Sequence, residues 1–508
     1  MTRSTTTALA AVIFVFAARR AEAGQKKPEP VYKLPVLTDD LDERIAMIRA
    51  AEYSGPQKHD CRSGYGYTGP ELFELHRELR LLVHGNLDEA PTARELELLV
   101  LIVYGKPDRP ITCGSIERKW RKKAAEGKEI SLFYDGYDVN RLMHQYRATG
   151  DIDYLDCAVV QADYVMADHD RRARDRAGYE TFYGKQCWLG IGRGFGGVAE
   201  VICEIANDPT LHFLVAVGGP EAKTGKTYIA RAREWTGDLR RLIEFRKSHD
   251  KYDNGKWYET EKEVNYKGGP AATNRYLYYV HFLIATAAAA EAVDAEANAA
   301  WVGGVRKTVD EVMAYFMRAC SRPEELRKEW FGDLIKTWSE DENAYIGEYG
   351  PYVIWSYKPR RHHPEDYIHL YMDMEAFDDI FRHDPEALPG RFMKRAARAL
   401  MTCTHDYPTG RILFNMMPSG NTKNPLTQPP WHTYFNPPYG KWIGRYMNDE
   451  AYDKFMKRQL LIWDDRLIEG KLGRFSQYTM PKEIVEARWF RYVDDAAWPV
   501  VGTRLPLD

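Results

Sequence analysis

The chain has 508 residues, a formal charge of −3 at neutral pH and a hydrophobic fraction of 44%. A chain of this length and composition can bury a sizeable core, and its near-neutral charge gives no general attraction to nucleic acid or to a membrane surface. It is also rich in aromatic residues, with 13 Trp, 33 Tyr and 19 Phe. Most of these belong in a core, but aromatic faces also stack on sugar rings, so a carbohydrate partner becomes somewhat more plausible.

The N-terminus has the features of a secretory signal peptide, which we assign to residues 1–23. A positive residue precedes Ala8–Ala18, an apolar run too short to span a bilayer, and Ala21–Ala23 fits a cleavage site between small residues. Arg19 and Arg20 stand unusually close to that site, so a retained anchor is the alternative. No later segment approaches the roughly 18 continuous apolar residues of a membrane helix. We therefore expect a secreted or periplasmic protein that does not contact the membrane after cleavage.

A Pro/Lys-rich leader over residues 24–37 precedes one expected catalytic domain over residues 38–508. Within that domain, apolar residues recur at helical spacing and are interrupted by helix-ending residues, so the pattern predicts successive helical hairpins. The predicted helices cover residues 38–51, 70–83, 92–104, 139–147, a partner from 151, 188–207, 228–248, 271–290, 297–320, 365–381, 390–403, 440–447 and 450–468.

The two helices of a predicted hairpin differ in character. The first is apolar, as in "GGPAATNRYLYYVHFLIATAAAA", and the second is amphipathic and charged, as in "RAREWTGDLRRLIEFRKSHD". A closed double ring has this asymmetry, because inner helices are enclosed and outer helices show one face to water. We therefore expect an all-α fold, an (α/α)6 or (α/α)7 toroid with minor β-structure. A helical solenoid is the alternative, but these hairpins have irregular lengths and lack a fixed period.

Three long segments, residues 247–270, 322–364 and 405–438, precede predicted inner helices. Long connections in compact domains are often functional, and we expect these to meet at the mouth of the ring. They carry aromatic residues suited to sugar binding and two short candidate strands, at residues 352–358 and 410–417. Their tryptophans are Trp257, Trp338, Trp355 and Trp431.

The first turns of the inner helices and the residues before them would line one cavity. The polar residues at these positions are Tyr134, Asp135, Tyr137, Asp138, Asn140, Lys185, Gln186, Trp188, Arg193, Asn274, Arg275, His362, His363, Tyr367, His369, His432, Tyr434 and Tyr439. This set is rich in Tyr, His, Asn and Arg and poorer in paired carboxylates. It suits β-elimination from a uronate, in which amide, imidazole or guanidinium groups offset the carboxylate charge and Tyr or His transfers protons.

The densest ionisable stretch is "RRHHPEDYIHLYMD", from Arg360 to Asp373. Proline at position 364 indicates a helix start, which explains the carboxylates that follow it in the first turn. His362, Asp366 and His369 share a helical spacing that a divalent cation could use, but zinc motifs are usually more sharply spaced, so we predict no metal and no cofactor.

Two glycine-rich stretches resemble nucleotide motifs only superficially. "GIGRGFGG" (Gly190–Gly197) and "GGPEAKTGKT" (Gly218–Thr227) both lack a preceding strand in a βαβ context. Close helix packing explains the first better, and a phosphate-binding loop is disfavoured for the second. The seven cysteines are widely spaced, which favours buried thiols, with one disulfide such as Cys61–Cys113 open after export.

Three stretches, "GPAATNRYLYY", "GEYGPYVIW" and "RRHHPEDYIHLY", carry a resemblance to a known group of proteins. Through them the chain resembles secreted polysaccharide lyases of the α/α-toroid group, and among them polysaccharide lyase family 38. This resemblance implies an anionic polysaccharide such as alginate or glucuronan as the substrate. It implies that Asn274 and His362 or His363 neutralise the substrate carboxylate, and that Tyr349, Tyr352 or Tyr367 transfers the proton. It also implies carboxylate binding by Arg275 or Arg361. We expect further substrate contacts from Trp188, Arg193, Trp257, Trp355 and His432.

Individual residues keep alternative explanations. Asn274 lies within an apolar helix, where a hydrogen bond inside the core is as good an explanation as a substrate contact. Two other functions also stay open. A toroid glycoside hydrolase would pair Asp135 or Asp138 with Glu348 or Asp366, and a non-catalytic carbohydrate-binding protein would use the aromatic loops alone.

Overall fold

We describe the fold from a computed structural model. The residues described are 77–83, 89, 92, 95, 112–128, 132–175, 188–215, 218–220, 222–258, 271–318, 320, 322–326, 328–356, 365, 367–403, 405–406, 411–412, 439–447, 450–468 and 483–491.

Most of the described chain is α-helical, which confirms the expected all-α class. The helices are α5 (Cys113–Ala125), α6 (Tyr137–Thr149), α7 (Ile152–Asp175), α9 (Trp188–Asn207), α10 (Tyr228–His249), α11 (Thr273–Val293), α12 (Ala295–Arg318), α13 (Lys328–Ile335), α14 (Tyr367–His383), α15 (Gly390–Cys403), α16 (Gly440–Tyr446) and α17 (Glu450–Ile468). Residues 77–83 and 483–491 are also helical. A π-helical turn, η2 (Leu132–Gly136), leads into α6, and short 3-10 turns are η3 (Pro209–Leu211), η4 (Ala222–Thr224) and η5 (Pro323–Glu325).

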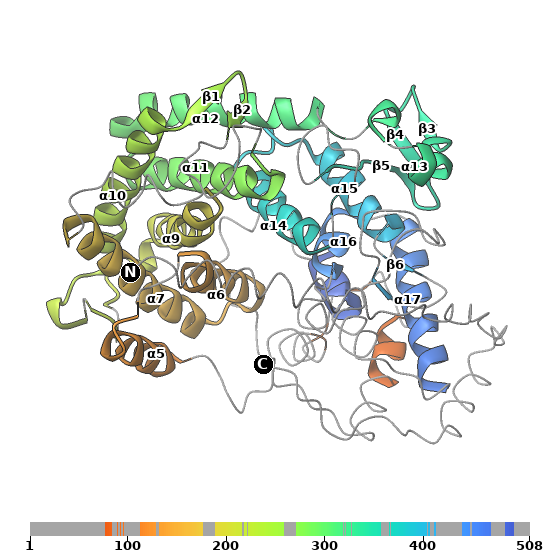
Figure 1. The fold of residues 1–508 in the computed structure, drawn as a ribbon. Helices are drawn as coiled ribbons and strands as arrows, with labels where there is room; N and C mark the ends of the chain where they lie inside the picture. Colours follow the sequence, from red (N-terminus) through yellow and green to blue (C-terminus); the bar gives the residue numbers. More distant parts are fainter. Residues whose placement is uncertain are drawn as a thin grey trace, which may run out of the picture.

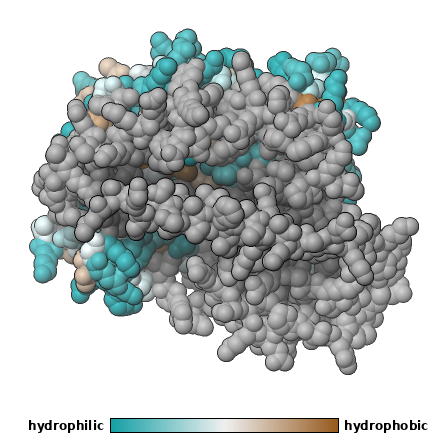
Figure 2. Space-filling model, viewed as in Figure 1, coloured by the Kyte–Doolittle hydropathy of each residue, from teal (hydrophilic) through white to brown (hydrophobic). Residues whose placement is uncertain are grey.

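Consecutive helices pack as hairpins. The pairs α6 with α7, α9 with α10, α11 with α12 and α14 with α15 are in contact. The first helices of these pairs also contact one another in chain order, α6 with α9, α9 with α11 and α11 with α14, so they form a central row (Figure 1). The described residues on the face drawn in Figure 2 are mainly hydrophilic along its upper and lower-left margins.

Local sequence signals explain several helix ends. Thr112 caps α5, because its hydroxyl accepts from the Ser115 N–H at 3.2 Å while the Ser115 hydroxyl accepts from the Thr112 N–H at 3.1 Å. Gly150 ends α6 in the left-handed conformation, with φ of 69°. Thr227 caps α10 through its hydroxyl. The predicted bounds of α9, α15 and α17 agree with the structure, and those of α6, α11, α12 and α14 differ by two or three residues at an end. The predicted helix at residues 38–51, and nearly all of the one at 92–104, lie outside the described residues.

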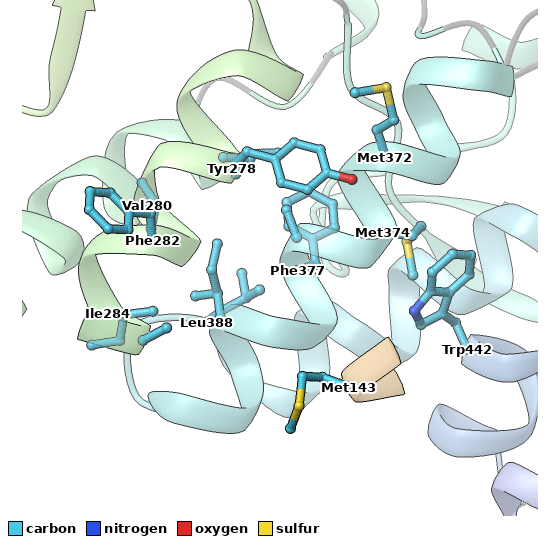
Figure 3. Packing of buried hydrophobic residues seen from close by; sticks show 14 of the residues in the cluster. Met143, Tyr278, Val280, Phe282, Ile284, Met372, Met374, Phe377, Leu388 and Trp442 are labelled. Atoms are coloured by element: carbon cyan, nitrogen blue, oxygen red, sulfur yellow. The ribbon is translucent and has the colours of Figure 1, made fainter. Parts of the chain in front are cut away.

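Helix α11 forms the centre of the hydrophobic core. It is long and apolar enough to cross a membrane, but 78% of its most apolar window is buried within this fold, as in the core helix of a soluble protein. Figure 3 shows side chains of α11 meeting those of neighbouring helices, with Tyr278 extending toward the part of α14 that carries Met372 and Phe377. Burial of α11 on all sides is what an enclosed inner helix requires.

The glycines of α9 permit close helix packing, which confirms the interpretation of "GIGRGFGG". A Cβ atom on Gly197 would lie 2.5 Å from the backbone nitrogen of Asn140 in α6. A Cβ atom on Gly196 would lie 2.9 Å from the imidazole of His281 in α11. The glycines therefore let α9 approach α6 and α11 on two sides, and they place His281 directly against α9.

Short antiparallel strands lie within the long connections. The hairpin of β1 (Lys251–Asp253) and β2 (Lys256–Tyr258) turns at Asn254-Gly255, where both residues have positive φ, at 46° and 84°. A second sheet joins β3 (Trp338–Ser339), β4 (Ala344–Gly347) and β5 (Gly350–Tyr352), and a third joins β6 (His405–Asp406) and β7 (Arg411–Ile412). The sequence patterns did not predict α5 or α13, because neither helix carries a long apolar period.

Candidate functional site

A cluster of tyrosines, an arginine and a carboxylate joins the central helices α6, α9, α11 and α14. The Tyr137 hydroxyl donates to Glu375 Oε1 at 2.7 Å, and the Tyr278 hydroxyl donates to Glu375 Oε2. The guanidinium of Arg193 stacks 3.7 Å from the centre of the Tyr137 ring and 5.4 Å from that of Tyr278. Four helices therefore deliver phenol, guanidinium and carboxylate groups to one place.

A histidine extends this cluster along α6. His144 Nδ1 lies 3.6 Å from Glu375 Oε1, and His144 Nε2 lies 3.3 Å from Asp379 Oδ1. The imidazole is thus held between two buried carboxylates of α14, while its side chain keeps an exposed fraction of 15%. Tyr137 and Arg193 are also only partly buried, whereas Tyr278 and Glu375 are buried. The side chains of Tyr137, His144 and Arg193 therefore keep some exposed surface, whereas those of Tyr278 and Glu375 keep almost none.

Beneath this cluster lies a largely buried ion-pair network around Glu200. Arg382 donates two hydrogen bonds to the Glu200 carboxylate, at 2.8 and 2.7 Å, and one to Asp379 Oδ1 at 2.9 Å. Arg147 donates to Glu200 Oε2 at 2.6 Å. The imidazoles of His281 and His383 approach Glu200 Oε1 at 2.9 and 2.8 Å. Each buried carboxylate is thus balanced by cations or imidazoles, as burial of charge demands.

The physical environment shifts the pKa values of these groups. Burial and then the Glu375 carboxylate raise the pKa of Tyr137, so this phenol holds its proton at neutral pH. Burial alone would raise the pKa of Glu200, but the surrounding cations, first of all Arg382, hold it well below its ordinary value. Burial would lower the pKa of His281, but the charges of Asp379 and Glu200 raise it.

Three of these residues have the geometry of a metal-binding group. Ligand atoms of Glu200, His281 and Asp379 all lie within 4.8 Å of one another. The Arg382 guanidinium, however, already donates to both carboxylates, so it occupies the place where a cation would bind them. The geometry favours an internal salt-bridge network over a metal centre at this position.

A pocket of about 370 Å³ opens beyond this network, where α9, α11 and α14 approach their C-terminal ends. It is lined by Arg147, Cys203, Glu204, Asn207, Ala288, Glu291, Ala292, Arg306, Arg382 and His383. Burial raises the pKa of the Glu204 carboxyl to about 7, although the charge of Arg147, 3.6 Å away, opposes this shift.

The N-terminal ends of α11 and α14 lie together. Thr273 donates from its hydroxyl to the carbonyl oxygen of Ser356 at 2.7 Å, and Glu365, just before α14, donates its N–H to the neighbouring carbonyl of Trp355 at 2.8 Å. Asn274, the second residue of α11, is therefore close to the chain that leads into α14. Its amide oxygen is buried and makes no hydrogen bond to the described residues.

Several predicted site residues lie inside the fold. Trp355 is 1% exposed, and its indole N–H donates to Asp373 at 2.8 Å. Trp257 packs on Tyr279 with ring centres 5.2 Å apart. Tyr352 is buried beside Tyr345 of β4, and burial raises its pKa.

Tyr349 is also buried, and its ring packs on Phe455 of α17 with centres 6.3 Å apart. Arg275 is half-buried in the first turn of α11. Trp188 and Tyr367 are the first residues of α9 and α14, and their side chains lie outside the described part of the structure. Arg361, His362, His363 and His432 also lie outside the described residues.

The carboxylates expected of a hydrolase are engaged by cations. Lys119 Nζ lies 2.6 Å from Asp138 and 3.2 Å from Asp135, and Lys123 also pairs with Asp135. Glu348 forms ion pairs with two basic residues of α17, at 2.8 and 2.6 Å. Asp366, the fourth of these carboxylates, lies outside the described residues.

The residues of this site that the sequence patterns did not predict are His144, Glu200, His281, Glu375, Asp379 and Arg382. The sequence does contain a signal for three of these residues. Glu375, Asp379 and Arg382 fall at i, i+4 and i+7, so they share one face of an otherwise apolar helix. Charged residues on a face that should be buried predict partners from neighbouring helices. A comparison of the chain with protein-family models, curated proteins and solved structures gives no match.

Proposed function

We propose that this protein is a polysaccharide lyase that cleaves a uronate polymer, of alginate or glucuronan type, by β-elimination. The observation that supports this most is the cluster of Tyr137, His144 and Arg193, three partly exposed side chains organised by the buried carboxylate of Glu375. It brings together the phenol, imidazole and guanidinium groups that this reaction needs.

The architecture that we propose around this cluster is an α/α toroid. Its inner helices would be α6, α9, α11, α14 and α16, and the second helix of each hairpin would lie outside. The contacts along the central row of helices support this arrangement. The cluster would then lie below the mouth of the ring, two turns or less from the helix starts for Tyr137, Arg193 and Tyr278.

The reaction requires removal of the C5 proton beside the uronate carboxylate and departure of the oxygen on C4. Arg193 would bind the carboxylate and offset the charge that develops as C5 loses its proton. His144, oriented by two carboxylates, would take the proton. Tyr137, whose raised pKa keeps it protonated, would give its proton to the departing oxygen.

Glu375 would complete the cycle. Its Oε1 atom accepts the Tyr137 hydrogen bond at 2.7 Å and lies 3.6 Å from His144 Nδ1. After each turnover His144 holds an extra proton and Tyr137 lacks one. The shared carboxylate oxygen offers a short route by which the proton returns. Asn274 in the first turn of α11, and His362 and His363, which precede α14 in the sequence, would supply further carboxylate contacts.

The direct test is a panel of alginate, glucuronan, hyaluronan, pectate and heparin-like polymers. A lyase leaves an unsaturated uronate end that absorbs ultraviolet light, whereas a hydrolase releases reducing ends without new absorbance. New absorbance with at least one polymer supports the proposal. Reducing ends without it would identify a hydrolase, and binding without either signal would identify a carbohydrate-binding protein.

Variants then separate the roles. Tyr137→Phe should lower kcat by about 10²-fold or more, because the proton donor is lost while the ring under Arg193 remains. Tyr446→Phe is the matched control, since the Tyr446 hydroxyl also donates to a buried carboxylate, Asp378 at 2.6 Å, outside the cluster. Equal activity of both variants would exclude Tyr137 as the donor.

The resemblance seen in the sequence instead assigns proton transfer to one of three other tyrosines, and substitution of each by phenylalanine tests that assignment. Tyr349→Phe, Tyr352→Phe and Tyr367→Phe should keep most of the activity if Tyr137 is the proton donor. If one of these variants loses activity on the order of 10²-fold while Tyr137→Phe stays active, that tyrosine is the proton-transfer residue instead of Tyr137.

A further inference from the structure

Two cysteines from separate helices face each other across the packing of α5 on α7. The Sγ atoms of Cys113 and Cys157 lie 3.4 Å apart, although the residues are 44 positions apart in the chain. A disulfide bond has an S–S length of about 2.05 Å, so the sulfurs would have to approach by a little over 1 Å to bond. The sequence contains no CxxC pair, and these two cysteines come together only in the folded chain.

The two thiols have different environments. Cys113 is the first residue of α5, is partly exposed, and has a pKa lowered mainly by the hydrogen bond with Cys157. Cys157 is 1% exposed, and its interaction with Cys113 together with burial raises its pKa. An accessible, more acidic thiol beside a buried one is the arrangement in which the first reacts with an oxidant and the second resolves the product.

We propose that Cys113 and Cys157 form a disulfide that fastens α5 to α7. The oxidant would be a small-molecule disulfide or a disulfide-bonded protein, present in the compartment to which the chain is exported. The Cys113 thiolate attacks one sulfur of the oxidant and releases one thiol. The Cys157 thiolate then attacks the Cys113 sulfur and releases the second thiol. Two protein thiols are oxidised, one disulfide is reduced to two thiols, and atoms and electrons balance.

The bond has a structural consequence at the N-terminus of α6. Lys119 and Lys123 of α5 hold Asp135 in the π-helical turn, and Lys119 also holds Asp138 in the first turn of α6. Tyr137 lies between these two aspartates. Fastening α5 therefore fixes the segment that positions Tyr137.

A second contact on the same helix supports this clamp. The Trp120 indole N–H donates to Gln161 Oε1 of α7 at 2.9 Å, and Gln161 Nε2 donates to the carbonyl oxygen of Asp135 at 2.7 Å. The disulfide would add a covalent link between the N-terminal end of α5 and α7 to these hydrogen bonds.

Peptide mapping of the full-length secreted protein tests the proposal. The protein is alkylated without reduction, digested and analysed by mass spectrometry, before and after incubation with oxidised glutathione. A linked peptide containing Cys113 and Cys157, lighter than the two thiol peptides by two hydrogen atoms, supports it. Alkylation of both residues after oxidation overturns it, and so does a link between Cys113 and Cys61.

Stability measurements provide a second readout. Reduction of the wild-type protein should lower Tm by a few degrees, because the bond closes a long loop in the unfolded chain. The same reductant should leave the Tm of Cys113→Ser and Cys157→Ala unchanged. Cys320→Ser, at a partly exposed cysteine outside the pair, is the control and should respond as wild type does. Equal responses of all four proteins would overturn the proposal.

Discussion

The raised pKa of Glu204 predicts how the stability of this protein depends on pH. Its carboxyl has a pKa of about 7 in the folded chain, against an ordinary value of 4.5, because it is buried in the pocket beside Arg147. Between these two values the folded state keeps a proton that the unfolded state releases. The unfolded state is therefore favoured increasingly as the pH rises from 4.5 to 7.

The size of the effect follows from the shift. A difference of about 2.5 pKa units, at about 1.4 kcal/mol per unit, corresponds to roughly 3 kcal/mol of folding free energy lost above pH 7. Glu204→Gln keeps the shape of the neutral carboxyl and cannot ionise. The stability of this variant relative to wild type should thus increase by roughly 3 kcal/mol between pH 4 and pH 8.

Urea unfolding of both proteins at a series of pH values measures this difference. Glu291→Gln is the control from the same pocket, because Glu291 is half exposed and pairs with Arg306 at 2.7 Å, a surface interaction worth about 1 kcal/mol or less. A stability difference between Glu204→Gln and wild type that stays constant from pH 4 to pH 8 would refute the reasoning.

Three further substitutions test the ion-pair network around Glu200 and the packing at two glycines. Arg382→Met should destabilise the protein by about 3–5 kcal/mol in denaturant unfolding, because it leaves two buried carboxylates without their shared partner, and a loss below about 1 kcal/mol would contradict the network. Gly197→Ala should cost about 1–3 kcal/mol, since the new methyl group would meet the Asn140 backbone at 2.5 Å. Gly303→Ala, with nothing within 4 Å of its added Cβ, should instead stabilise the exposed helix by about 0.5–1 kcal/mol, and the same sign for both glycine variants would refute this contrast.

The positions of the main helices could be predicted from the sequence because their signals are local. Apolar residues at helical spacing mark α9, α11 and α15, and Gly150 marks the end of α6. The glycine stretch of α9 likewise indicates close packing without reference to a partner. Helix α5 was not predicted, because it lacks a long apolar pattern. It is stabilised by a capping box and by burial of only Ile116 and Trp120.

The residues of the candidate site could not be predicted from local sequence in this way. Residues in conspicuous motifs, such as Trp355 and Tyr352, proved to lie in the core, where an aromatic side chain gains most from burial. Tyr137 and Arg193 stood in the broad set of polar residues near helix starts, but nothing local distinguished them. His144 belonged to no motif at all.

The sequence by itself determined the all-α class, the hairpin pattern and the approximate positions of the main helices, because each depends on residues within a few turns of one another. Only the tertiary structure decided which polar groups meet. Tyr137 and Glu375 are 238 positions apart, and Arg382 and Glu200 are 182 positions apart. Their pairing depends on the packing of α6, α9 and α14. Because burying an unpaired charge costs free energy, the fold is stable only when each buried carboxylate pairs with a group from another helix.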